Sequence, residues 1–343
     1  MRARDWTRLP TLLLTLTATF LSSAVSAAEE INLYTTREAA LVKPVTDAFT
    51  KATGITVNAT FIEDNLSKRV ASEGKTSPAD VLLTIGLDKT SQFATLGLTR
   101  PIKSTALDKA IPFELRDRGR AWFGMAMRPR VVVARSDSAL ASITYEDLAK
   151  PEWRGKLCMR TVLHQNNVAL VAAYLLHNGV PATEAWLKGL KTNLAGLPEG
   201  KDNDVIRRIA QGRCEIGIAN TVALAQLRDG REGADWKTDA DKVKAVPTTF
   251  RNRGTHMNVT AVGIAKHAPH KAAALKFVEF LVTDEAQKLF AEAELEYPVT
   301  KTGARAPIVT DIGSFPIDDR PIDQIATTQK AAVDLIRKAG FTK

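Results

Sequence analysis

The sequence predicts an α/β fold arranged as two domains with a cleft between them. In the N-terminal part, segments with strand and helix patterns alternate, which is typical of a parallel sheet with right-handed crossovers. The length of 343 residues suits two domains of ordinary size, each with its own core. Two apolar runs within residues 122–135, separated by Arg128-Pro129-Arg130, indicate a segment that crosses from one domain to the other.

Residues 1–27 have the pattern of a secretory signal peptide. Three arginines among the first eight residues form a basic region, and an apolar stretch follows over residues 12–21. Small residues at 25–27 fit a cleavage site, so we expect the mature chain to begin near Ala28. The apolar stretch is too short to span a bilayer comfortably. The sequence therefore predicts export to the periplasm.

The charge balance argues against nucleic-acid binding. The chain has 47 Lys and Arg against 38 Asp and Glu, a formal net charge of +9, and its basic residues are scattered. Neither a basic run nor interleaved aromatic residues are present to follow a nucleic-acid backbone. The positive excess favours an anionic ligand or a negatively charged surface.

Two cysteines, Cys158 and Cys214, are the whole cysteine content of the chain. In an oxidising compartment an even pair is most simply a disulfide. Such a bridge would tie the strand at 157–160 to the strand that ends before Asn220, and its role would be structural.

The N-terminal elements follow from the spacing of apolar residues and from turn signals. Alternation and β-branched residues predict strands, and apolar residues three and four positions apart predict helices. The sequence predicts strands over 30–37, 55–62 and 79–84, and helices over 38–50 and 66–73.

The second half follows the same rules and contains a return crossing. A short helix is expected at 144–148, strands at 157–160, 215–219 and 243–246, a crossing strand at 254–264, and helices over 167–177, 271–281, 284–292 and 325–339. These assignments give a lobe one of residues 28–130 plus 255–305 and a lobe two of 131–254 plus 306–343.

The junction at Asn220-Thr221 is the first candidate for a ligand site. An apolar strand over 215–219 runs directly into a helix there, and Asn and Thr favour helix starts. Open α/β sheets bind ligands beyond the carboxyl ends of their strands, where helix N–H groups are free. The polar loop at 161–166 occupies a similar place, and the disulfide would set it beside Asn220.

Several stretches, taken in order and spacing, resemble the ferric-iron-binding family of periplasmic solute-binding proteins that serve ABC importers. The resemblance covers essentially the whole mature sequence, and the cysteine pair resembles one branch of that family. It implies a two-lobed periplasmic-binding-protein fold with hinge strands and a cleft that closes on its ligand. The matching stretches are 77–81, 122–124, 153–156, 217–221, 253–259, 280–287 and 296–299.

The metal ligands that this resemblance implies are missing from the sequence. The family has two adjacent tyrosines after the Asn-Thr pair, because phenolate oxygens suit a hard Fe(III) ion. Val222 and Ala223 stand there, and a third tyrosine position falls at about Asn166. The first-lobe histidine position falls at about Glu38, and the acidic position after the third strand at Ile85 or Gly86.

Five consecutive residues of the first lobe are ligand candidates: Tyr34, Thr35, Thr36, Arg37 and Glu38. Tyr34 is expected to form a wall of the cleft. Arg37 either pairs with a ligand carboxylate or phosphate through its planar fork or forms a salt bridge between the lobes. Glu38 is either a metal or amine ligand or a partner of the helix dipole.

The second lobe contributes His164, Asn166, Asn220 and Thr221 as candidates. His164 and Asn166 form either a polar pair facing the ligand or a solvated loop. His256 belongs to the crossing strand, where a structural hydrogen bond is expected. Asp88 receives no assigned role.

The sequence therefore predicts a solute-binding component of an ABC importer that performs no chemistry. The motifs of serine hydrolases, zinc proteases and phosphate-binding loops are absent from the sequence. We expect no resident cofactor, an inner-membrane permease as partner and a monomeric state. The cargo is either iron(III), held as a chelate or through a non-tyrosine site, or a metal-free organic anion or phosphate ester.

Overall fold

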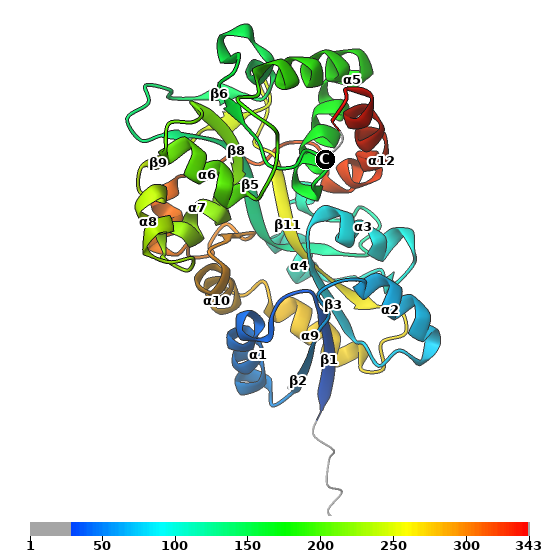
Figure 1. Cartoon of the computed structure of the whole chain (residues 1–343). Coiled ribbons are helices and arrows are strands. Elements are labelled where there is room, and N and C mark those ends of the chain that lie inside the picture. The colour runs from blue at the N-terminus through cyan, green and yellow to red at the C-terminus, as the bar shows by residue number, and fades with distance from the viewer. Residues whose placement is uncertain (1–28, 342–343) are drawn as a thin grey trace, which may run out of the picture.

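Two sheets meet along one long strand, β5 (Phe123–Arg135), which runs through the middle of the molecule (Figure 1). The computed structural model describes residues 29–341, so the predicted signal peptide lies outside the described residues. Residues 123–129 of β5 pair with β11, whereas residues 130–135 pair with β8 and β9. The change of partner between Pro129 and Arg130 shows that this segment passes from one group of strands to the other.

The first sheet has the strand order β2-β1-β3-β11-β5. β1 pairs in parallel with both β2 and β3, as the alternating strands and helices predict, and β11 is antiparallel to β3 and β5. The short strands β4 and β12 pair with β11 and β5. The bounds are β1 Glu30–Thr35, β2 Thr56–Phe61, β3 Val81–Ile85, β4 Thr99–Arg100, β11 Met257–Ala265 and β12 Tyr297–Pro298.

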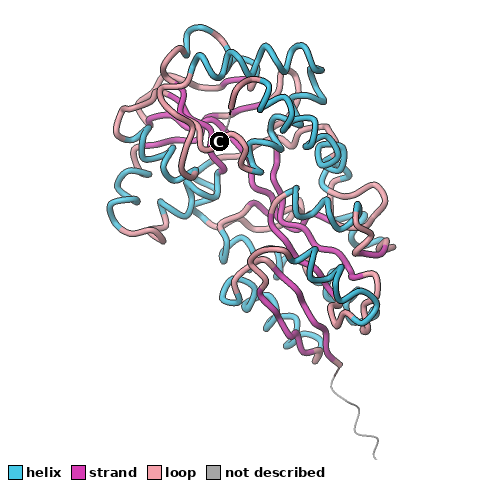
Figure 2. Tube along the Cα trace, turned by 45° about the vertical axis from the view of Figure 1, so that its right-hand side comes forward, coloured by secondary structure: helices cyan, strands magenta, loops and turns pink. Residues whose placement is uncertain are grey.

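The second sheet continues from β5 to β8 and then β7, with β9 also against β5. β7 and β8 are parallel, and a separate two-stranded sheet joins β6 to β10. Figure 2 shows the two groups of strands connected through the long strands in the middle. The bounds are β6 Ile143–Thr144, β7 Leu157–Cys158, β8 Ile216–Asn220, β9 Val243–Val246 and β10 Thr248–Thr249.

Twelve α-helices lie within residues 29–341, and most of them cover the two sheets. Their bounds are α1 Ala39–Thr53, α2 Leu66–Glu73, α3 Leu87–Thr95, α4 Thr105–Ala110, α5 Gln165–Asn193, α6 Asp202–Ala210, α7 Thr221–Arg228, α8 Ala234–Ala240, α9 Lys271–Phe280, α10 Asp284–Glu294, α11 Pro307–Ile312 and α12 Ile322–Lys338.

Local chemistry explains several helix ends. α1 ends at Gly54, whose φ of 74° is the left-handed conformation that glycine adopts without strain. α10 is capped by Thr283, whose hydroxyl accepts from the backbone N–H of Ala286. α5 is broken at Gly179, where φ and ψ leave the helical region, and Pro181 then starts the second segment.

Each lobe has an aromatic core. In the first lobe Phe49 of α1 meets Phe277 of α9 edge to face, with ring centroids 5.0 Å apart. In the second lobe Tyr174 stacks on Trp186 at 4.1 Å within α5. The C-terminal helix α12 packs along α5 (Figure 1) and also contacts α3.

The predicted elements recur with shifted ends, and two predictions were wrong in detail. The helix expected at 144–148 is the strand β6 followed by a 3₁₀ turn at 146–149, because Ile143 donates its N–H to Pro247 and joins β10. The strand expected at 254–264 begins at Met257 and pairs only within the first sheet, so the return crossing lies just before it. The assignment of the remaining residues to lobes stays a prediction.

None of the helices in residues 29–341 has the length and apolar character needed to cross a membrane.

Candidate functional site

The carboxyl ends of several strands face each other where the lobes meet. β1, β3 and β8 end at Thr35, Ile85 and Asn220, and α1, α3 and α7 begin within four residues of those ends. β7 leads through the loop at 159–164 to the start of α5. Helix N–H groups from both lobes are thus directed towards one region, as in other α/β ligand sites.

The lobes touch at this region through Asp88 of α3 and Gln165 of α5. With its amide nitrogen towards the first lobe, Gln165 donates to both carboxylate oxygens of Asp88, at 3.0 Å for Oδ2. Burial raises the pKa of Asp88, partly offset by backbone N–H groups and Lys89. A cavity of about 290 Å³ lies beside this contact and is lined by Asp88, Thr84 and the start of α2.

Tyr34, Thr35 and Thr36 are held by other protein groups. The Tyr34 hydroxyl bonds to Glu73 at 3.1 Å, and burial is the main cause that raises the pKa of this phenol. The Thr35 hydroxyl accepts from the N–H of Arg37, and the Thr36 hydroxyl lies 3.2 Å from that of Thr84. Tyr34 therefore packs against α2, and only Thr36 of the three is partly exposed near the cleft.

Arg37 is buried inside the first lobe and does not form an edge of the cleft. Its side chain is 0% exposed and pairs with Glu296 at 2.7 Å and with Glu294. The hydroxyl of Thr260 also accepts from it. Since two carboxylates already neutralise the guanidinium, the structure disfavours the hypothesis that Arg37 clamps a ligand anion. The alternative, in which Arg37 forms a salt bridge, fits the structure. Its carboxylate partners, however, lie in the predicted lobe one and not across the cleft.

Glu38 remains available to a ligand. It precedes α1 with extended backbone angles, and its side chain is exposed. Within residues 29–341 it makes neither a capping hydrogen bond nor an ion pair. Its position at the helix start also keeps the dipole interpretation open.

His164 caps α5 and is neutral near pH 7. Its Nδ1 accepts from the backbone N–H of Asn166 at 3.2 Å. Burial, reinforced by Arg160, Arg130 and Arg128, lowers the pKa of His164 to about 4. Asn166 itself is half-buried at the first turn of the helix. The pair therefore lies at the predicted place, with His164 in a structural capping role.

Asn220 belongs to a buried polar network. Its Oδ1 accepts from Arg130 at 3.0 Å, and its N–H donates to Asp202 at 3.0 Å. Arg130 also bonds to Asn167 and pairs with Asp202 at 3.1 Å. Although burial opposes the effect, the charges of Arg130 and Arg160 lower the pKa of Asp202. Asn220 thus holds the junction in place.

Thr221 differs from its neighbour because its hydroxyl has no partner. The residue is 1% exposed, and its Oγ1 makes no hydrogen bond to any described group. Unpaired buried hydroxyls are uncommon, since each loses its hydrogen bonds to water. The next two residues, Val222 and Ala223, are buried and offer no oxygen donor at the positions that the family resemblance assigns to tyrosines.

Arg160 is a charged residue of the loop after β7 that the sequence interpretation did not select. It lies two positions after β7, in the loop that leads to α5. Its side chain is 13% exposed, Nη1 lies 3.5 Å from Asp202, and Nε has no hydrogen-bond acceptor within residues 29–341. Burial lowers the pKa of this guanidinium, which nevertheless stays charged. The sequence signal that could have identified Arg160 is its position at the carboxyl end of a predicted strand.

His256 is fully buried in the crossing region. Burial lowers the pKa of His256 to about 3, and neither ring nitrogen meets a hydrogen-bond partner in the described part of the chain. The expected structural hydrogen bond comes from the backbone instead, since its N–H donates to the Tyr145 hydroxyl at 3.1 Å.

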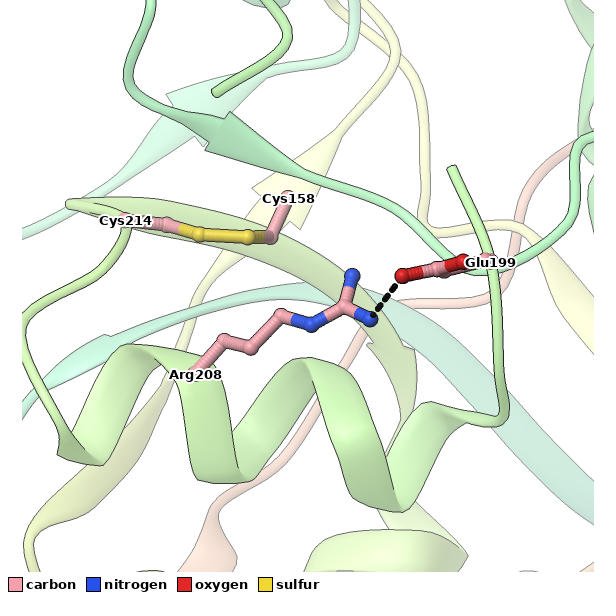
Figure 3. The surroundings of a disulfide bond; sticks show 4 residues. All are labelled: Cys158, Glu199, Arg208 and Cys214. Carbon is pink, nitrogen blue, oxygen red and sulfur yellow. Dashed lines mark hydrogen bonds and ion pairs between the residues drawn. A yellow bond between two sulfur atoms is a disulfide. The ribbon is translucent and has the colours of Figure 1, made fainter. Parts of the chain in front are cut away.

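The disulfide joins Cys158 of β7 to Cys214, two residues before β8 (Figure 3). The parallel register sets Cys158 opposite Gly217, so the loop after β7 and the Asn220 junction lie next to each other as predicted. Arg208 and Glu199 form an ion pair at 3.1 Å beside the bridge.

Comparisons with known proteins agree on one family. The model of the family described as "Bacterial extracellular solute-binding protein" matches residues 34–288. Iron uptake protein A1 of Synechocystis sp. is 35% identical over 318 residues, covering 91% of this chain and 88% of that protein. The Fe(3+)-binding periplasmic protein of Serratia marcescens is 27% identical and covers 94% of each chain.

Solved structures give the same answer for the whole fold. The Bordetella ferric binding protein is 42% identical with a TM-score of 0.89, covering 92% of this chain and 100% of the other. A Trichodesmium protein (IdiA, FutA) in complex with iron and citrate ligands is 36% identical with a TM-score of 0.87, covering 91% and 100%.

Proposed function

Because the chain belongs to the bacterial extracellular solute-binding protein family, we propose that it is the solute-binding component of an ABC importer of the iron(III) uptake type. It captures its cargo outside the inner membrane and delivers it to a membrane permease. The signal-like N-terminus supports a periplasmic location. We expect it to act as a monomer and to perform no catalysis.

Iron(III) is supported as cargo by the relatives. Two relatives are named for iron uptake or Fe(3+) binding, and two similar solved structures are those of a ferric binding protein and of a protein in complex with iron and citrate. Their similarity extends over at least nine-tenths of this chain. Two proteins that share only a fold need not have similar sequences over so much of their length. We therefore propose for this chain the same class of transport that its relatives are named for.

The form of the iron follows from one observation. Val222, Ala223 and Asn166 occupy the three positions that the resemblance assigns to tyrosines, so the phenolate charge that a bare trivalent ion needs is missing. Glu38 and Asp88 supply two carboxylates at most. We therefore propose that iron arrives as a chelate with a small carboxylate such as citrate. The Trichodesmium protein, solved in complex with iron and citrate ligands, supports this form.

A metal-free organic anion or phosphate ester is the second candidate. Arg160 favours it, because the Nε of this buried guanidinium has no acceptor among the described residues. Guanidinium groups bind carboxylate and phosphate oxygens equally well. The cleft chemistry alone therefore admits both cargo classes.

Calorimetric titration of the mature chain tests the proposal. Ferric citrate should bind and raise the melting temperature, with about 2.7 kcal/mol of stabilisation at a free concentration of 100 times Kd. Citrate alone, glycerol 3-phosphate and ferric chloride kept soluble by a weak chelator serve as comparisons. The visible spectrum of the iron complex should lack an intense phenolate-to-iron band.

Two outcomes would reject parts of this proposal. A strong phenolate band would mean that tyrosines bind the metal, against the site described above. Binding of glycerol 3-phosphate without any binding of ferric citrate would replace the iron chelate with the metal-free cargo.

A further inference from the structure

A cavity of about 480 Å³ lies between the end of β4 and the first half of α9. Three basic side chains line it: Arg100, Lys103 and Lys271. The rest of the lining is apolar and includes Ile264 and Leu275. Among the described residues that line this cavity, none carries a carboxylate. The cavity therefore combines an apolar wall with charge of a single sign.

The three basic side chains are not neutralised by the protein. None of them makes an ion pair or a side-chain hydrogen bond with any residue between 29 and 341. Two carboxylates on neighbouring segments are already engaged. Glu279 accepts from the Ser104 hydroxyl at 2.6 Å, and Asp80 lies 2.9 Å from the ring of His270. The positive charge of the cavity is thus available to an anion from outside the chain.

The shape of the cavity strengthens the attraction for an anion. A concave surface with walls of low dielectric constant and charges of one sign concentrates the electric field and raises the local concentration of counterions. Lys271 and Ala272 are the first two residues of α9, so the positive end of the helix dipole adds to this field. Arg100 is half-buried, and its planar guanidinium can bind two oxygens of a carboxylate or phosphate.

The apolar wall favours an anion that carries a hydrocarbon part. Ile264 is 4% exposed and forms the bottom of the wall, Leu275 is half-buried, and Pro101 and Ala272 are exposed. A simple inorganic ion would leave this surface in contact with water. Each methylene group that covers it should increase affinity about fourfold.

The cavity lies at the end of the first sheet that is remote from the cleft. Ile264 pairs with Arg100 of β4 and with Val81, the first residue of β3. The cleft lies beyond Ile85, the last residue of β3, which pairs with Thr260. In Figure 1, α9 lies in the lower part of the molecule, whereas β8 lies in the upper part. The cavity is therefore separate from the candidate cargo site.

We propose that this cavity is a second ligand site, which binds a phosphate group attached to a short apolar body. Arg100, Lys103 and Lys271 receive the phosphate oxygens, and the wall around Leu275 covers the apolar body. An anionic phospholipid of a membrane and a free alkyl phosphate present this same chemistry. Because the site is remote from the cleft, its occupancy leaves the affinity for cargo unchanged.

Calorimetric titration with three matched probes tests the proposal. Hexyl phosphate carries both features of the ligand, inorganic phosphate lacks the apolar body, and hexanol lacks the charge. Hexyl phosphate should bind about tenfold or more tightly than either of the others, since two covered methylene groups suffice for this ratio. Its affinity should fall as the salt concentration is raised, because exposed charges are screened.

Variants of the lining residues identify the site. The double variant Lys103→Gln with Lys271→Gln should weaken hexyl phosphate about fivefold. Ala272→Asp places a negative charge at an exposed position in the first turn of α9, where it suits the helix dipole, and should abolish binding while the fold stays stable. Lys276→Gln is the control, because Lys276 lies on the same helix, pairs with Glu29 at 3.4 Å and does not line the cavity.

Sedimentation with lipid vesicles distinguishes the two sources of the ligand. If vesicles that contain phosphatidylglycerol bind the wild type and not the double variant, and vesicles of phosphatidylcholine bind neither, the ligand is a membrane lipid. If hexyl phosphate binds but the vesicles do not, the ligand is a free alkyl phosphate.

Three results would overturn the proposal. In the first, hexyl phosphate binds no more tightly than inorganic phosphate. In the second, the double variant or Ala272→Asp binds hexyl phosphate as the wild type does. In the third, saturating hexyl phosphate displaces the cargo, which would place the phosphate in the cleft.

Discussion

Buried arginines dominate the electrostatics of individual residues in this protein. Arg37 and Arg130 are both fully buried, and each is held by carboxylates from distant parts of the sequence. A buried charge is tolerated only when it is paired and hydrogen-bonded. These two side chains therefore belong to the framework of the protein, whereas Arg160 has only Asp202 as an ion-pair partner, and its Nε has no acceptor within residues 29–341.

Replacing Arg37 with alanine should destabilise the fold. The change leaves Glu294 and Glu296 buried with part of their compensation removed, and loss of one partner from such a cluster costs about 3–5 kcal/mol. Urea unfolding followed by circular dichroism measures the loss. Lys43→Ala, which removes an exposed ion pair within α1, the helix that follows Arg37, should change the stability by less than about 1 kcal/mol. If the variant kept wild-type stability but lost cargo binding, Arg37 would be a ligand-binding residue after all.

The junction of β7 and β8 is the element that organises the second lobe. The disulfide, the parallel register and the Asp202 network all converge on the loop after β7 and the start of α7. Gly217 is required there, because a Cβ at this position would lie 2.5 Å from Val205 of α6. The loop after β7 and the start of α7 are therefore fixed relative to each other.

Removal of the disulfide should lower the stability of the fold without removing cargo binding. The bridge closes a sequence separation of 56 residues, which in the chain-entropy model corresponds to about 4 kcal/mol. The melting temperature of the protein with and without reductant, and of Cys158→Ala with Cys214→Ala, measures the effect. Mass measurement after thiol labelling should show both thiols masked before reduction. Two freely labelled thiols in the native protein would contradict the bridge.

Closure of the whole molecule depends on how closely the lobes approach at Gly86 and Gln165. Gly86 has a φ of 94°, and a Cβ there would lie 2.5 Å from the terminal amide group of the Gln165 side chain. The lobes are joined by β5 and by the return crossing beside it, so they can move about these segments as a hinge.

Gly86→Ala should hinder closure. The added methyl occupies the space into which Gln165 moves, so the variant should bind ferric citrate more weakly and show a smaller decrease in radius of gyration on binding, as measured by X-ray scattering. Gly54→Ala is the control, because Gly54 also has a positive φ but a Cβ there would meet nothing described within 4 Å. Both variants should lose about 1 kcal/mol or more of stability from backbone strain. Equal cargo binding by the two variants would show that the lobes do not approach at Gly86.

Most of the fold and part of the site were predictable from the sequence. Local periodicity placed β1, α1, β2, α2 and β3, because the pattern of apolar residues is set by the geometry of each element. The analysis of periodicity missed α3, α6 and other short helices, whose patterns of apolar residues are weaker. The sequence also placed the Asn220 junction and the loop containing His164 at helix starts that follow strands, because such starts have a local signature, while their part in a ligand site stays a prediction.

The sequence by itself determined the family, the cysteine pair and the absence of tyrosines at three positions of the resemblance, because these depend only on which residues follow one another. The tertiary structure decided the roles of the charged residues. Arg37 finds its partners more than 200 positions away, and Asp88 meets Gln165 only across the cleft. Whether a charge is free for a ligand depends on such long-range contacts, which periodicity and local motifs do not encode.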